Sequence, residues 1–195
     1  MAFSRVVLWN NATSIFGGDS SGIIEEVTDE GDVAKWLRMF DQEACDYCVS
    51  LFDWQDAMAF SQVAAAVGTI ARADWEYAYA KPANMLRIID FTDEDGRLLQ
   101  SPYELMGGYI LCDQTPGYIK YIRQMVLTSG GDLLLMSPAL RDLIAKRLAV
   151  MISPVYMPAM KGTAIAEFEM SLNEARAVNQ DNVYKAKTGW IYDIG

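Results

Sequence analysis

The period at which apolar residues recur changes twice along this chain, and that change constrains the fold more than any single motif. Over residues 33–51 apolar side chains return every three or four positions, which is the spacing of one helix face. Over residues 75–79 aromatic side chains alternate with other types, which is the spacing of a strand. Helical spacing returns over residues 138–152. The order predicts an α+β fold with a β segment inserted between two helical ones.

The helical parts are predicted from their periodicity and their end signals. A short helix over residues 3–16 should end at Gly17-Gly18, and Asp32 is expected to cap the second helix. A third helix should start at Ser137-Pro138 and end at Pro154, since proline interrupts the hydrogen-bond ladder. A last helix is expected from about Thr163, followed by an apolar tail.

Short strands are predicted between these helical parts, separated by prolines and by glycine pairs that are expected to form turns, among them Gly107-Gly108 and Gly130-Gly131. The expected strands cover residues 75–79, 85–91, 103–106, 109–112 and 118–125. Asp93-Glu94-Asp95-Gly96 is expected to form a hairpin turn. Short strands at regular spacing favour a small antiparallel barrel or sandwich.

The predicted organisation therefore has four segments. They are residues 1–56, the first part of a helical bundle; residues 57–132, the inserted β module; residues 133–180, the second part of the bundle; and residues 181–195, an extended C-terminal docking tail.

Composition narrows the function. The chain has no histidine, so it lacks the commonest general base and metal ligand. Its net charge of −10 argues against a protein that grips nucleic acid, although an acidic wall would let DNA slide past. No apolar run is long enough for a membrane span or a secretory leader, so we expect a protein made in a cytoplasm.

The candidate chemical motifs favour structural roles. Cys45 and Cys48, with only Cys112 elsewhere, are too few for a zinc site, and they lie inside a helix rather than at its start. The alternating aromatics Trp75, Tyr77 and Tyr79 are expected to pack in a β core rather than to form a stacking platform. We therefore predict no catalytic residue, no metal and no cofactor.

Several short segments together carry a family resemblance. They are Asn11-Ala12, Phe16-Gly17, Phe52-Asp53-Trp54, Trp75-Glu76-Tyr77-Ala78-Tyr79-Ala80-Lys81-Pro82, Met85-Leu86-Arg87, Tyr103-Glu104, residues 107–113, Tyr121-Ile122-Arg123, residues 138–149 and Glu174-Ala175-Arg176. In this order and spacing they resemble the tail tubular protein A family of podoviruses, the head-to-tail adaptor or gatekeeper proteins. The acidic stretch over residues 19–32 departs from that pattern, since it is longer and more charged.

The resemblance implies a non-enzymatic virion protein. Members are expected to form a dodecameric ring under the portal protein at the head-to-tail junction, after synthesis in the bacterial cytoplasm. The ring would extend the channel for double-stranded DNA, without binding it specifically, toward a nozzle similar to tail tubular protein B. The C-terminal tail would contact the portal, and no membrane is involved.

Three sets of residues are candidates for these contacts. For the ring interface they are Trp9, Trp36, Trp54, Met151, Met157 and Met160, because interfaces favour tryptophan and methionine. For the portal-docking tail they are Trp190, Ile191, Tyr192 and Ile194. For an acidic channel wall or rim they are Asp19, Glu25, Glu26, Asp29 and Glu30.

Two other classes of function remain open on the sequence alone. A small enzyme or ligand-binding protein would use the β module as a cup and bind a saturable small ligand. An acidic decoy that mimics DNA would spread carboxylates over one exposed face and bind a basic partner. The apolar content of 52% favours assembly over the decoy.

Overall fold

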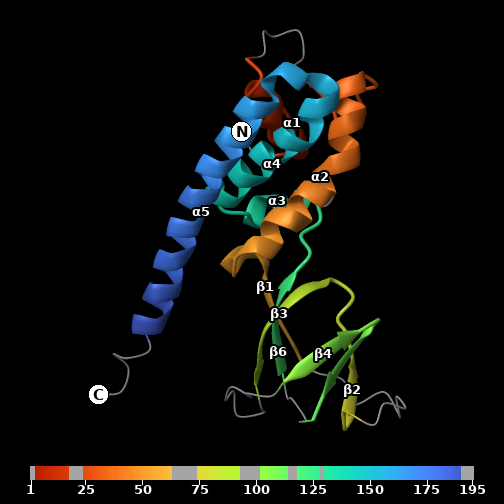
Figure 1. Cartoon of the computed structure of the whole chain (residues 1–195), viewed down its shortest axis with the longest axis vertical. Helices are drawn as coiled ribbons and strands as arrows, with labels where there is room; N and C mark the ends of the chain where they lie inside the picture. Colours follow the sequence, from red (N-terminus) through yellow and green to blue (C-terminus); the bar gives the residue numbers. More distant parts are fainter. Residues whose placement is uncertain are drawn as a thin grey trace. The chain divides into compact units, whose positions relative to one another are not determined.

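The computed structural model describes residues 3–17, 24–62, 74–92, 102–113, 118–127 and 130–189. The chain is mixed α+β and divides into two compact units, one made of Met1–Asp56 with Met125–Gly195 and the other of Ala57–Gln124 (Figure 1). The predicted inserted segment extended to residue 132. The structure ends it at Gln124 because Met125 and Leu127 are buried with the helices, where the Gln42 amide binds Met125 O at 2.8 Å and accepts from Leu127 N at 3.3 Å.

The helical unit is built around one central helix. Its helices are α1 (Arg5–Ser14), α2 (Asp32–Leu51), α3 (Gly130–Leu135), α4 (Pro138–Tyr156) and α5 (Lys161–Gly189), with 3₁₀ turns at Gln55–Ala57 and Pro158–Met160. Helix α4 packs against α1, α2 and α5, and Figure 1 shows it between α5 and α2. Eight of its residues are buried, on more than one side of the helix, which fits this central position.

Two predicted helix ends are wrong for identifiable reasons. Gly31 is the N-cap of α2, and Asp32 is instead its first residue, where a carboxylate still favours the positive end of the helix dipole. Helix α4 does not end at Pro154 but continues to Tyr156. Proline has no N–H to give to Val150 O, and the Ser153 hydroxyl donates to that carbonyl at 2.9 Å instead.

Two further predictions about the C-terminal half also need correction. Gly130-Gly131 does not form a turn but begins α3, where Asp132 Oδ2 accepts from Val126 N at 2.8 Å. The tail predicted over residues 181–195 is helical up to Gly189. Between Thr163 and Thr188 there is neither proline nor glycine, so nothing breaks the ladder before Gly189. Residues 190–195 lie outside the described part of the chain.

The β unit contains two antiparallel sheets of three strands. The strands are β1 (Met58–Gln62), β2 (Tyr77–Ala80), β3 (Met85–Thr92), β4 (Tyr103–Met106), β5 (Tyr109–Cys112) and β6 (Tyr118–Arg123). The orders are β1-β6-β3 and β2-β5-β4, and the described strands do not close into a barrel, so that alternative is wrong. The predictions for β4 and β5 are confirmed residue for residue. Strand β1 was missed because Met-Ala-Phe-Ser-Gln shows neither β-branched residues nor a clear alternation.

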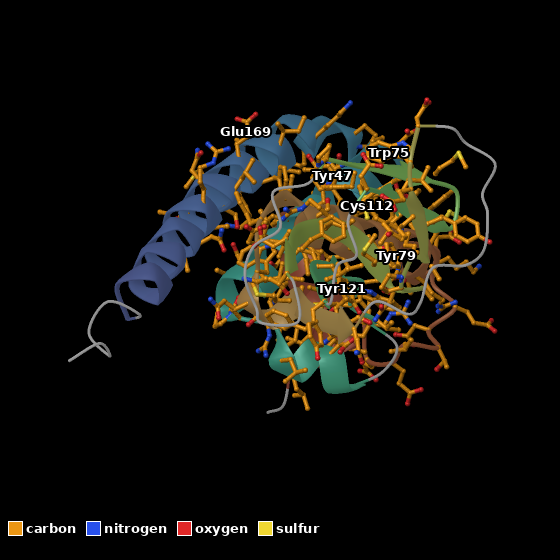
Figure 2. The ribbon with its side chains drawn as sticks, turned by 90° about the horizontal axis from the view of Figure 1, so that it is seen from below. Tyr47, Trp75, Tyr79, Cys112, Tyr121 and Glu169 are labelled. Atoms are coloured by element: carbon orange, nitrogen blue, oxygen red, sulfur yellow. The ribbon has the colours of Figure 1, made fainter. Side chains whose placement is uncertain are left out.

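The two sheets share one apolar core. It contains Tyr79, Ile110 and Cys112 from one sheet, and Met85, Ile88, Phe91, Ile119 and Tyr121 from the other (Figure 2). Strand β3 buries every third residue rather than every second. Two register shifts, between Met85 and Arg87 and between Ile88 and Asp90, each insert an extra residue and restore the inward direction.

The aromatic stretch predicted as one strand is divided in the structure. Tyr79 is buried in the shared core and stacks on Tyr77 with ring centroids 6.2 Å apart, so core packing is confirmed for this pair. Trp75 precedes β2, and its indole N–H donates to Glu104 Oε2 on β4 at 3.1 Å. Trp75 therefore lies outside β2 and is not part of the alternation of that strand.

A buried carboxylate joins α1 to α2. Asp41 is fully buried on α2, and both of its oxygens accept from the guanidinium of Arg5. Its Oδ2 also accepts from the indole N–H of Trp9, at 2.8 Å. The Arg5 guanidinium and the Trp9 indole N–H therefore satisfy one carboxylate, as a buried charge requires.

Replacing Asp41 with Ala should lower the free energy of unfolding of the helical unit by about 3–5 kcal/mol, because Arg5 and Trp9 would keep buried donors without an acceptor. Denaturant unfolding followed by helical circular dichroism measures this change. The matched control is Asp32→Ala, whose side chain is 92% exposed and pairs with Lys35 only at 3.6 Å, so only its weak helix-dipole contribution should be lost and stability should fall far less. Equal losses in both variants would contradict the anchoring role of Asp41.

Candidate subunit interface

Two of the tryptophans predicted at the ring interface are core residues. Trp9 is fully buried against Asp41, and Trp54 is buried with its indole N–H donating to Cys48 O at 3.0 Å. Neither side chain has surface to offer a neighbouring subunit, so this part of the prediction is wrong. Residue type alone could not separate a tryptophan with an internal acceptor from one on the surface.

The third predicted tryptophan lies on the outer side of α2. Trp36 and Phe40 are half-buried, and their rings stack with centroids 6.1 Å apart and planes 10° apart. Met39 beside them is 64% exposed. Two turns further along, the ring of Tyr47 is only partly free, because it lies against Phe168 of α5 and Arg147 of α4. The buried side of this helix, which includes Leu37, Ala44 and Cys48, faces elsewhere. An apolar outer side on a helix whose inner side is already packed is typical of an interface.

The predicted methionines occupy the end of α4 and the turn after it. Met157 is exposed, whereas Met151 and Met160 are half-buried. Val155, which the sequence analysis did not name, is also exposed beside them. They follow one another closely along the chain, and their place in an interface stays a prediction.

Other exposed apolar side chains were missed by the sequence analysis. Leu134 and Leu135 on α3 and Met170 on α5 are exposed by 57%, 61% and 57%. Helix α5 buries Ala164, Phe168, Ser171 and Ala175, a stripe at steps of four, three and four. Met170 falls outside that stripe, so periodicity read against the correct buried residues could have found it.

The acidic loop before α2 is held in a defined conformation. Asp29 is half-buried, and its Oδ2 accepts from the backbone N–H groups of Glu25 and Glu26 at 3.0 and 3.4 Å. Arg38 Nη2 donates to the carbonyls of Val27 and Asp29. Glu25, Glu26 and Glu30 project into solvent, and Asp19 lies outside the described residues. One of the predicted acidic residues thus shapes the loop, and three present charge.

The two neighbouring cysteines are core residues of the helical unit. Cys45 and Cys48 are free thiols with no exposed surface, and their sulfurs lie 3.7 Å from Met125 O and 3.6 Å from Leu143 O. Burial raises the pKa of both thiols far above the ordinary value. A thiol that stays protonated is a poor nucleophile and a poor metal ligand, so the pair contributes packing.

The residues that the structure describes hold neither a metal-ligand cluster nor a membrane-spanning helix. Within the described ranges, no three His, Cys, Asp or Glu residues are grouped so that they could hold a metal ion. None of the helices in that part of the chain combines the length and hydropathy needed to span a bilayer. No protein-family model matches this sequence, and a search of curated proteins finds no significant match.

A polar cluster fixes the orientation of α5 on α4, and so fixes which side of α5 faces outward. Lys146 Nζ lies 3.2 Å from Asp142 Oδ2 and 3.4 Å from Glu167 Oε2. Asp142 Oδ2 also accepts from the buried Ser171 hydroxyl at 2.6 Å. Partial burial lowers the pKa of Lys146, but the hydrogen bonds and negative charges of Asp142 and Glu167 outweigh it and raise the pKa above 10.5.

The variant Lys146→Met should destabilise the helical unit by about 0.5–1 kcal/mol near neutral pH. The unfolded chain releases the lysine proton first as the pH rises, so the stabilisation is complete below pH 10.5 and is lost above the raised folded pKa. Denaturant unfolding of both proteins across the alkaline range should therefore show the gap closing. The control Lys35→Met removes an exposed pair and should change little at any pH. A gap that widened with pH would exclude this role of Lys146.

Proposed function

We propose that this chain is a non-enzymatic, ring-forming head-to-tail adaptor of a tailed bacteriophage. The observation that carries the proposal is the apolar surface left on the helical unit after its core is complete. Met39, Leu134, Leu135 and Met170 are each more than half exposed and come from three different helices. A closed ring uses two different faces of each subunit, so apolar residues on several sides are what such a subunit needs.

The resemblance to tail tubular protein A supplies the finer expectations. The ring is dodecameric, the helical unit is a portal-facing bundle, and the ring extends the DNA channel toward a nozzle protein in the virion. The tail residues Trp190, Ile191, Tyr192 and Ile194 dock on the portal. Met151, Met157 and Met160 are further candidates for contacts between subunits or with the portal.

The net charge of −10 supports a channel that does not retain DNA. Glu25, Glu26 and Glu30 are exposed on a loop with a defined backbone, and phosphate groups are repelled by such a surface. Our proposal places this loop at the channel wall or rim.

Electron microscopy of the purified protein, imaged with and without portal rings, tests the assignment. The expected result is an additional ring with twelvefold symmetry on one face of the portal. Bovine serum albumin, an acidic protein unrelated to portals, serves as the control for nonspecific adhesion. A protein that stays a monomer or dimer at every ratio to portal rings would exclude the adaptor function.

The variant with Glu25, Glu26 and Glu30 replaced by Lys should slow genome ejection, because a basic loop would attract the passing phosphates. Asp29 is kept because it binds the loop backbone. The matched control replaces the same three residues with Gln, which removes the negative charge without adding attraction. Ejection rates of assembled virions measure the effect. If the Lys variant ejected the genome at the wild-type rate, the proposed position of this loop in the channel would be contradicted.

A further inference from the structure

The acidic loop before α2, residues 24–30, is held to α1 by one side chain that bonds its backbone twice. Asn10 Nδ2 donates to Ile24 O at 2.9 Å, and Asn10 Oδ1 accepts from Ile24 N at 3.0 Å. Ile24 itself is buried. An amide side chain that pairs with both backbone groups of one residue imitates the pairing of two strands. It therefore fixes the position and direction of the chain where the loop begins.

Asn10 is a fixed point because α1 is anchored on α2. The residue before it, Trp9, is fully buried and donates to Asp41 Oδ2, and Arg5 donates to both oxygens of the same carboxylate. The start of the loop is thus connected through α1 to the core of the helical unit.

Arg38 on α2 holds the other part of the loop by its main chain. Its Nη2 donates to Val27 O at 2.7 Å and to Asp29 O at 2.8 Å. A guanidinium beside several carboxylates would ordinarily pair with them. Here its hydrogen bonds go to carbonyl groups, so it fixes the backbone without neutralising the acidic side chains by direct pairing.

The exposed glutamates of the loop, Glu25, Glu26 and Glu30, take no part in this attachment. In the described part of the chain, none of their carboxylates lies within ion-pair distance of a lysine or arginine. Like charges so close in sequence repel one another, which favours a loop that spreads apart. The loop nevertheless has a defined backbone, and Asn10 and Arg38 supply the hydrogen bonds that join it to the helices.

We propose that Asn10 and Arg38 are positioning residues, which hold the three glutamates at one place on the helical unit so that their charge acts on passing DNA from a fixed distance. This inference rests on the proposed adaptor function, in which the loop lies at the channel. At physiological ionic strength the repulsion between exposed charges is screened over about 8 Å. A displacement of the loop by a few ångströms therefore changes the effect of the same three charges.

Amide hydrogen exchange of the purified full-length protein tests the positioning. The variants N10A and R38M should each raise the exchange rate of peptides covering residues 24–30 by about tenfold, through loss of the hydrogen bonds to the backbone. Alanine is a strong helix former, so α1 should persist in N10A, and the protection of α2 and α4 should be unchanged. Wild-type exchange in either variant would overturn the role of the substituted residue.

The matched controls are N11A and K35M. Asn11 follows Asn10 on α1 but is exposed, and K35M removes the same charge as R38M from an exposed site on α2. Neither substitution should change exchange in the loop. A rise in K35M equal to that in R38M would assign the effect to charge and overturn the positioning role of Arg38.

Genome ejection from assembled virions separates position from charge. The charge reversal E25K/E26K/E30K is compared in the wild-type background and in the N10A/R38M background. It should slow ejection in the wild-type background and slow it several-fold less in the loosened one. Equal slowing in both would overturn the positioning role while leaving the loop at the channel. No slowing in the wild-type background would instead contradict the proposed place of the loop in the adaptor.

Discussion

The burial of α4 is the constraint on which the rest of this structure depends. Leu140, Leu143, Ile144, Leu148 and Ile152 are all fully buried, so this helix needs cover on several sides. The cover comes from α1 and α2, which precede the β unit, and from α5, which follows α4. Since both ends of the chain are needed around one helix, the β unit is placed in the middle of the sequence. Its first and last strands pair at Met58 and Ile122, so the insertion leaves and returns at neighbouring points.

Covering one helix with three others leaves each covering helix with an outer side. In α1 that side is polar, whereas α2 and α5 carry Met39, Trp36 and Met170 outward. Burying one such side chain contributes about 1.5–3 kcal/mol, which is small for one contact between two free proteins. In a closed ring the same contact is repeated around the axis, and every subunit is held on two sides. Weak individual contacts can then support a stable assembly, especially on a template.

Sequence patterns predicted the parts whose local signals agree with their packing. The strands β4 and β5 were found because glycines and alternation mark them, and α2 because its apolar face is long. Failures occurred where a tertiary contact decided the local structure. Ser153 satisfies the carbonyl that Pro154 leaves free, and Asp132 fixes the start of α3. Two of the predicted interface tryptophans, Trp9 and Trp54, failed for the same reason. Trp9 has an internal acceptor in Asp41, whereas Met39 and Met170 became visible only once the buried side of each helix was known.

The acidity of the chain sets a limit on how such subunits can meet. Copies with a net charge of −10 repel one another, but this repulsion is screened over about 8–10 Å at physiological ionic strength. Apolar contact acts at shorter range and is not screened, so it prevails only where two surfaces touch closely over a patch with balanced charge. The exposed Met39 on α2 meets that condition, since exposed Lys35 and Glu43 lie one turn to either side of it. The loop carrying Glu25, Glu26 and Glu30 does not, and it is better suited to face a solvent-filled channel than another subunit.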